Sequence, residues 1–171
     1  MERLFQFSKM DMGEYPVHLE PLDIRNATQS AMAAAGRETL SVSMDDLAPE
    51  IALADREQYE RIVLNVLDNS RKYRSGDTAH VDISSRREAD RVIVTFADDG
   101  PGVDEDKLPR LFDVFFRVDP ARKNPSGGSG LGLAIVKKAA EQMHGSVSAE
   151  KSALGGLAIV LCLPWAGEER K

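Results

Sequence analysis

The sequence is poor in cysteine and has no long apolar run. Its single cysteine, Cys162, excludes a disulfide within the chain, and the apolar neighbours in AIVLCLP place the thiol in a buried strand under reducing conditions. No apolar run approaches the roughly 20 residues that a membrane-spanning helix needs. The first twelve residues also lack the apolar stretch of a secretory signal. These absences predict a soluble, cytoplasmic fragment.

Acidic residues outnumber basic ones, which argues against one class of partner. The formal net charge is -6, and the acidic residues are spread along the chain instead of forming a tail. Sequence-independent binding to nucleic acid is therefore not expected, and any polyanion would have to bind to a local group of cationic side chains. The 171 residues, 42% apolar and 29% charged, fit one globular domain.

Apolar periodicity predicts helices and strands that are intermixed along the chain. The first dozen residues are typical of the end of a helix, and further helices are expected over 24–35, over 56–74, and after a long Gly-rich loop, ending at Gly145. Strands are expected over 40–44, 51–54, 80–86, 91–98, 146–150 and 157–163, with an edge strand within 15–24. This order favours an α+β two-layer sandwich, with a mixed sheet of about five strands and about three helices on one face.

One predicted helix carries a polar shoulder beside its apolar stripe. Asn65, Asn69, Lys72 and Tyr73 fall at i, i+4, i+7 and i+8. An amide oxygen suits Mg²⁺ when phosphates supply the charge, lysine suits phosphate, and tyrosine offers a flat face. Polar flanks also occur on ordinary solvated helices, so the shoulder alone does not identify a site.

The segment FADDGPGV places an acid at the end of a predicted strand, before a sharp turn. Asp98 is positioned to accept a hydrogen bond from an exocyclic amine, as on adenine, while Gly100 and Gly102 let the backbone approach a ring. A common tight Asp/Gly turn explains the same residues equally simply.

The segment GGSGLGLAIV leads four glycines into the second core helix. Free backbone N–H groups and the helix dipole suit phosphate at such a position. A P-loop would need lysine after Gly132, where Leu133 stands, and the dinucleotide fingerprint would need glycine at 133 after a strand. The glycine run therefore belongs to another kind of site.

The combination of these clusters is more specific than any one of them. NVLDNSRKY, DDGPGV, LFDVFFRVD and GGSGLGLAIV resemble the N, G1, F and G2 boxes of bacterial sensor histidine kinases. These kinases belong to the superfamily that includes gyrase, heat-shock chaperone and mismatch-repair ATPases. The resemblance spans roughly residues 15–164 and implies the Bergerat ATP-binding fold.

The resemblance implies ATP and Mg²⁺ as cofactors and assigns roles to the clusters. Asn65, Asn69 and Lys72 would be the catalytic set, with Asn69 as the Mg²⁺ ligand and Lys72 on phosphate. Tyr73 would pack against adenine and Asp98 would recognise it. The remaining implied nucleotide-binding residues are Gly100, Gly102 and Val103 in the pocket wall, Arg117 and Arg122 in a lid over about 104–129, and Gly128, Ser129, Gly130, Leu131, Gly132 and Leu133 around the phosphates. Phe112, Phe115 and Phe116 would anchor the lid in the core.

Asn65 distinguishes branches of the superfamily. By the resemblance, members that hydrolyse ATP have a glutamate at this position, which acts as the general base that removes a proton from the attacking water. An amide cannot accept that proton at neutral pH. The amide thus favours phosphoryl transfer over hydrolysis. A non-catalytic nucleotide-sensing module and an ATP-hydrolysing machine stay as alternatives.

The phosphoacceptor of the family has no counterpart among the histidines of this sequence. Relatives are phosphorylated in an HELRTP-like context, unlike His18, His80 or His144; His144 fits a helix C-terminus that interacts with the helix dipole. We therefore expect residues 1–14 to be the end of the dimerisation helix and linker, 15–165 the ATP-binding catalytic domain and 166–171 a tail. The implied partners are the dimerisation domain of the same protein, in a homodimeric and membrane-anchored parent, and a response regulator receiver domain.

Overall fold

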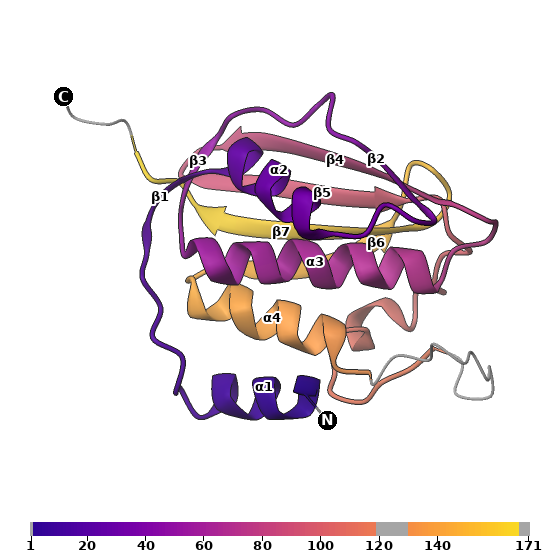
Figure 1. The fold of residues 1–171 in the computed structure, drawn as a ribbon, viewed down its shortest axis with the longest axis horizontal. Helices are drawn as coiled ribbons and strands as arrows, with labels where there is room; N and C mark the ends of the chain where they lie inside the picture. The colour runs from indigo at the N-terminus through magenta and orange to yellow at the C-terminus, as the bar shows by residue number, and fades with distance from the viewer. Residues whose placement is uncertain (1, 119–129, 168–171) are drawn as a thin grey trace.

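The computed structural model describes residues 2–118 and 130–167, which form two sheets and a layer of helices (Figure 1). The helices are α1 (Glu2–Asp11), α2 (Ile24–Ala34), α3 (Arg56–Lys72) and α4 (Gly132–Gln142), with a short 3-10 turn η1 (Leu108–Arg110). The strands are β1 (Glu20–Asp23), β2 (Leu40–Ser43), β3 (Ile51–Ala54), β4 (Ala79–Glu88), β5 (Arg91–Asp98), β6 (Ser146–Lys151) and β7 (Leu157–Pro164).

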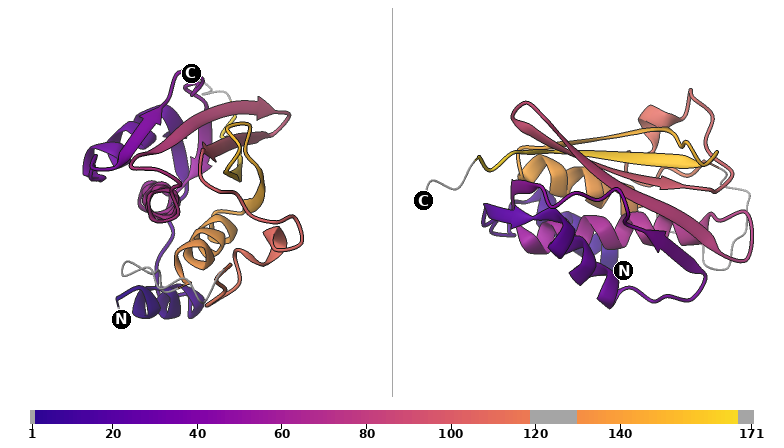
Figure 2. Two further views of the ribbon diagram at one scale, coloured as in Figure 1. Left: turned by 90° about the vertical axis from the view of Figure 1, so that its right-hand side faces the viewer. Right: turned by 90° about the horizontal axis from the view of Figure 1, so that it is seen from above.

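The main sheet is mixed and five-stranded, in the order β2-β4-β5-β7-β6. Only the β2–β4 pair is parallel within it. Helices α2, α3 and α4 cover one face of this sheet, and α1 lies beyond α4, away from the strands (Figure 2). The predicted α+β sandwich with three helices on one face is confirmed.

The helix that carries the polar shoulder is held firmly at its start. Asp55 caps α3 by accepting a hydrogen bond of 2.9 Å from the Gln58 N–H, and its other oxygen accepts one of 2.8 Å from the His18 N–H. The predicted stripe of Tyr59, Ile62, Val63, Val66 and Leu67 is buried against the sheet. The polar shoulder is thereby fixed at the edge of the core.

Two local expectations differ from the structure. The predicted edge strand does not join the main sheet, because β1 pairs antiparallel with β3 in a separate two-stranded sheet. Gly145 was expected in the left-handed position that ends α4, but His144 takes that conformation at φ 59°. Gly145 is instead needed for space, since a Cβ atom there would collide with the Cys162 carbonyl oxygen.

Across the described ranges, no helix combines the length and the apolar character that crossing a membrane requires.

Candidate functional site

The carboxylate of Asp98 lies buried at the end of β5, where three elements meet. Its Oδ1 accepts hydrogen bonds from the N–H groups of Gly100, at 3.0 Å, and Leu157, at 2.9 Å. Its Oδ2 accepts one from the Ser70 hydroxyl, at 3.0 Å. The side chain is only 7% exposed, so these bonds replace the water that a buried carboxylate loses. Asp98 therefore joins α3, β7 and its own turn.

Gly156, in the turn between β6 and β7, completes the support of Asp98. Its N–H donates a 3.2 Å hydrogen bond to the Asp98 carbonyl. A Cβ atom on Gly156 would collide with Asp98 and with the Gly100 nitrogen. Gly102, at φ 73°, lies against the same turn, because a Cβ atom there would come within 3.4 Å of the Gly155 carbonyl. The hairpin thus forms a glycine-lined wall beside the acid.

Sequence reasoning missed Ser70, Leu157 and Gly156. Ser70 did carry a recognisable sign, since it continues the apolar stripe of α3 one turn after Val66 and Leu67. A buried hydroxyl in such a stripe needs a polar partner. No sequence signal marks Leu157 and Gly156, because both contact Asp98 through their backbone N–H groups.

The polar shoulder of α3 faces the beginning of α4. Asn65 donates a hydrogen bond from Nδ2 to the Arg61 carbonyl at 2.9 Å. A Cβ atom built on Gly132 would lie 3.5 Å from Asn65 Oδ1. The structure therefore brings Asn65 to the first turn of α4.

The other end of the shoulder meets the turn after β5. Tyr73 ends α3 and is exposed, and a Cβ atom on Gly100 would lie 3.2 Å from the Tyr73 carbonyl. Asn69 lies on α3 between Asn65 and Tyr73, one turn from each. The shoulder consequently runs from the α4 N-terminus to the turn that holds Asp98.

A cluster of charge surrounds Asp68 on the same helix. Its carboxylate lies 2.7 Å from Arg3 Nη2, 3.1 Å from Lys72 Nζ and 3.5 Å from Arg71 Nη2. Burial raises the pKa of the Asp68 carboxyl, but hydrogen bonds from Arg3 and Lys72 and the charges of both outweigh burial and hold the pKa below its usual range. Asp68 is therefore ionised beside Lys72, the predicted phosphate contact.

The beginning of α4 has the backbone geometry expected of an anion site. Leu131 stands at the N-cap, where its apolar side chain cannot cap the first N–H groups of the helix. Leu131 and Leu133 are buried, which fixes the helix start against the core. Gly130, at φ 72°, has no space for a Cβ atom because the Phe115 backbone lies 2.8 Å away.

Of the predicted lid, over about 104–129, the structure describes residues 104–118. Phe112 is buried and Phe116 is partly buried against the core, as expected of the predicted anchors, and Leu111 is buried beside Phe112. Phe115 is 60% exposed, so its predicted anchoring role is wrong. The Phe115 N–H donates a 3.0 Å hydrogen bond to the Gly130 carbonyl, and the residue has a left-handed backbone conformation at φ 65°.

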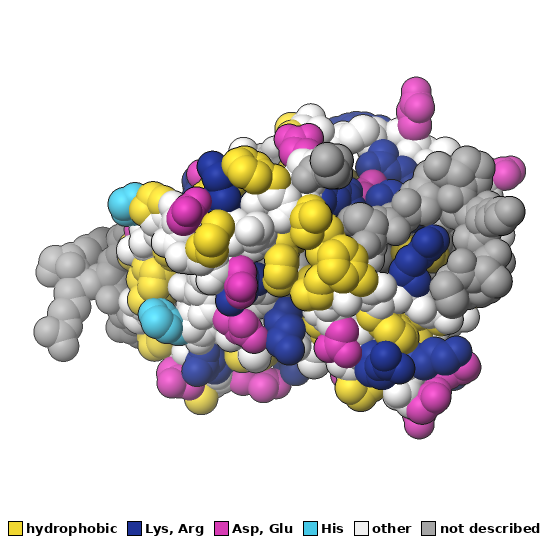
Figure 3. All heavy atoms as spheres, turned by 90° about the horizontal axis from the view of Figure 1, so that it is seen from below, with side chains coloured by type: hydrophobic (Ala, Val, Ile, Leu, Met, Phe, Trp, Pro, Cys, Tyr) yellow, Lys and Arg dark blue, Asp and Glu magenta, His cyan; other side chains and the backbone are white. Residues whose placement is uncertain are grey.

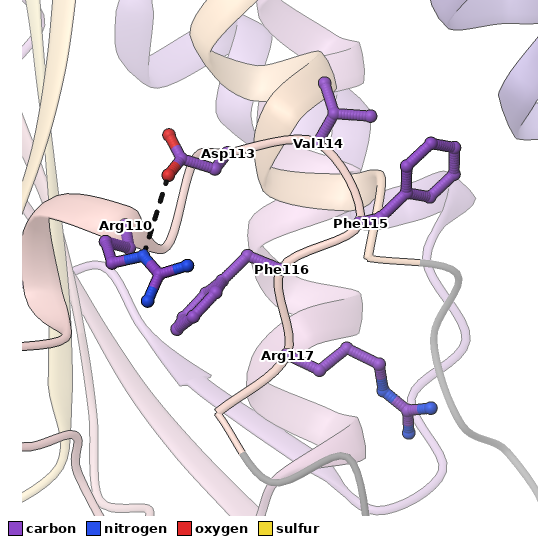
Figure 4. Close-up of a pocket in the computed structure, with 6 residues that line it drawn as sticks. All are labelled: Arg110, Asp113, Val114, Phe115, Phe116 and Arg117. Carbon is purple, nitrogen blue, oxygen red and sulfur yellow. Dashed lines mark ion pairs between the residues drawn. The ribbon is translucent and has the colours of Figure 1, made fainter.

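This part of the lid surrounds a hollow of about 460 Å³ (Figure 4). Arg110 lies over the Phe116 ring, 4.6 Å from its centroid, and 4.0 Å from the Asp113 carboxylate. Arg117 points away from Arg110, and its Nε is buried without a hydrogen-bond partner among the residues the structure describes. A buried donor of this kind is suited to an anion.

The structure therefore gathers most of the predicted site residues in one region. Helix α3 carries Asn65, Asn69 and Lys72, and Tyr73 is its C-cap. This helix lies next to the turn of Asp98, Gly100, Gly102 and Val103 and to the start of α4 at Gly130, Leu131, Gly132 and Leu133. Arg122, Gly128 and Ser129 lie outside the described residues. The region has the buried carboxylate of Asp98 at one end, and Lys72 and the first turn of α4, which has no side-chain cap, at the other.

Comparison with known proteins points to one family. The model of the family described as histidine kinase-, DNA gyrase B-, and HSP90-like ATPase matches residues 54–167. That segment contains every residue predicted for the site. The Escherichia coli (strain K12) signal transduction histidine-protein kinase BaeS is 33% identical over 171 residues, which cover 96% of this chain and 36% of BaeS. The chain thus spans little more than a third of that relative.

Solved structures agree with the family. The mycobacterial sensor histidine kinase MprB superposes with a TM-score of 0.76 at 27% identity, over 87% of this chain and 100% of that one. The ATP-binding domain of PrrB from Mycobacterium tuberculosis superposes with a TM-score of 0.68 at 27% identity, over 87% and 98%.

Proposed function

The chain belongs to the histidine kinase-, DNA gyrase B- and HSP90-like ATPase family, and from this premise we propose that it donates the γ-phosphoryl group of Mg²⁺-ATP to a histidine on a separate dimerisation domain. It would then act as the catalytic domain of a two-component sensor kinase. The domain supplies position and charge neutralisation, with no covalent nucleophile of its own.

The observation that carries this proposal is the position of Asn65. It lies against the α4 N-terminus, where phosphates are favoured, and its Nδ2 is bonded to the Arg61 carbonyl. An amide held in this way has no basic group to activate water. Phosphoryl transfer to an external acceptor is therefore favoured over hydrolysis.

Asp98 supports the adenine end of the proposal. Three protein hydrogen bonds hold its carboxylate, and a carboxylate has room for further donors on its two oxygens. The exocyclic amine of adenine is a donor of this kind, whereas guanine carries a carbonyl at the same place. The acid would therefore select ATP over GTP.

The donor set also fits Mg²⁺ held chiefly by nucleotide phosphates. Within the described residues, no group of three His, Cys, Asp or Glu side chains is placed to hold a metal ion. Asn69 offers a neutral oxygen one turn from Asn65, as a phosphate-assisted site needs. When bound, the ion would neutralise phosphate charge, while Lys72 and Arg117 would add protein cations.

The face that carries α1 supports a helical partner. Leu4 and Phe5 are 45% and 63% exposed, and apolar side chains gather on the face seen in Figure 3, where α1 lies nearest the viewer. Exposed apolar surface of this kind is usually covered by another protein. The dimerisation domain, in a homodimeric, membrane-anchored parent, fits this role, with a response regulator receiving the phosphoryl group on the cytoplasmic side.

The test uses radiolabelled ATP and two variants of Asn65. We expect the isolated chain to bind ATP with little self-labelling and little phosphate release, and a chain joined to a dimerisation domain that carries the acceptor histidine to gain acid-labile label. Asn65→Glu should raise phosphate release, whereas Asn65→Gln should not. Strong self-labelling or rapid hydrolysis by the wild-type chain would overturn the proposal, and absence of ATP binding would favour a docking module.

A further inference from the structure

Arg3 reaches the nucleotide site from outside the segment that matches the family. It belongs to α1, whereas the match begins at residue 54. Its Nη2 lies 2.7 Å from Asp68 Oδ2, and its Nη1 lies 3.5 Å from a Cβ atom built on Gly132. The guanidinium thus stands between α3 and the first turn of α4.

The rest of α1 holds Arg3 in this place. Met10 is fully buried, and its carbonyl accepts a 3.0 Å hydrogen bond from Gln142 Nε2 on α4. Lys138, also on α4, lies 3.0 Å from Asp11. These contacts dock the far end of α1 without Arg3, so α1 keeps contacts with α4 when Arg3 is substituted.

The charges around Asp68 indicate what Arg3 does there. Asp68 Oδ2 is shared between Arg3 and Lys72, at 2.7 and 3.1 Å, in a partly buried setting. If Arg3 were lost, the negative carboxylate would face the proposed phosphate position with one counter-charge fewer. It would also attract the Lys72 ammonium more strongly, in competition with a phosphate group.

We propose that Arg3 is a positioning residue of the nucleotide site, which offsets the charge of Asp68 and shares its carboxylate with Lys72 so that the phosphates of ATP are bound. The inference rests on the proposed function, because it takes the start of α4 as the phosphate position. It makes nucleotide affinity depend on whether α1 is docked.

The test compares ATP with adenosine, which has no phosphate, as displacers of a fluorescent trinitrophenyl-ATP. Arg3→Ala should weaken ATP about fivefold, on the scale of one partly exposed ion pair, and leave adenosine unchanged. Arg3→Lys should recover most of the loss. In the Arg3→Ala background, Asp68→Asn should restore ATP affinity, because the carboxylate that has lost one of its cations is then replaced by a neutral amide.

Lys138→Ala is the matched control, since it removes another ion pair of α1 without touching Asp68. Equal ATP affinity in Arg3→Ala and Lys138→Ala would overturn the inference, as would an equal loss for ATP and adenosine, which indicates only a structural role. A wild-type chain that binds neither probe would instead overturn the proposed function, and the inference with it.

Discussion

Ser70 on α3 donates a 3.0 Å hydrogen bond to Asp98 at the end of β5. This bond joins the helix that presents Asn65, Asn69 and Lys72 to the turn that is proposed to recognise adenine. One buried polar contact therefore connects the two ends of the proposed site, and a substitution at Ser70 should affect both of them.

Ser70→Ala should lower the free energy of unfolding by about 1–3 kcal/mol, because it removes a donor from a buried carboxylate. ATP affinity should fall as well, since Asp98 loses the group that orients Oδ2. Denaturant unfolding and calorimetry measure the two effects. Ser30→Ala, on the exposed face of α2, is the control and should change neither quantity. Equal behaviour of the two variants would contradict the account.

Gly156→Ala should destabilise the fold by roughly 1–3 kcal/mol, because the new methyl group would be forced against Asp98 and Gly100. Thermal unfolding and ATP titration should both report the change. Gly76→Ala is matched to it, since no atom lies within 4 Å of a Cβ atom at Gly76. If Gly156→Ala kept wild-type ATP affinity, the glycine wall would have no part in the site.

Some elements of the fold can be predicted from the sequence, and others cannot. The helix over 56–74, the strand over 91–98 and the mixed sheet follow from periodicity, because their apolar faces pack against one core. Periodicity does not predict the positive φ at His144, nor the need for glycine at 145, where a Cβ atom would collide with Cys162. Both depend on the path of β7. The sequence after α4 indicates that the helix ends at a glycine, but not why position 145 requires one.

Within the proposed site, the grouping of side chains on one helix follows from the sequence, whereas contacts with residues far away in the sequence do not. Asn65, Asn69 and Lys72 share a helical period, so their common face follows from spacing. Arg3 is 65 residues from Asp68 in the sequence, and nothing local signals their contact. The resemblance implies that Phe115 anchors the lid in the core, but the residue is 60% exposed, which its apolar type does not reveal.

Asn69→Ala should weaken ATP binding roughly tenfold in Mg²⁺, the scale of one lost contact to a charged group, and much less in EDTA. The reason is that the amide is proposed to bind the metal ion and not the nucleotide. Calorimetry in the two buffers separates the cases. Equal losses with and without Mg²⁺ would count against the ligand role.

Acid should remove the contribution of Asp68 to stability. Its pKa is held below the usual range in the folded chain, so its ion pairs stabilise the fold above about pH 4 and cease to do so as pH falls through the lowered value. Wild type should therefore exceed Asp68→Asn in unfolding free energy at pH 6, and the gap should shrink below about pH 4. Glu105→Gln, at an exposed site, should show no such change. A gap that is constant with pH would refute this assignment.

Asp98→Asn tests the central claim most directly, because the amide can keep the bonds from Gly100 and Leu157 on its oxygen and meet Ser70 through its nitrogen. The fold should therefore survive while the acceptor for the adenine amine is lost. Titration of wild type and Asp98→Asn with ATP and GTP should show ATP affinity falling at least about tenfold and the preference for ATP over GTP collapsing. A variant that still prefers ATP by the wild-type factor would contradict the account.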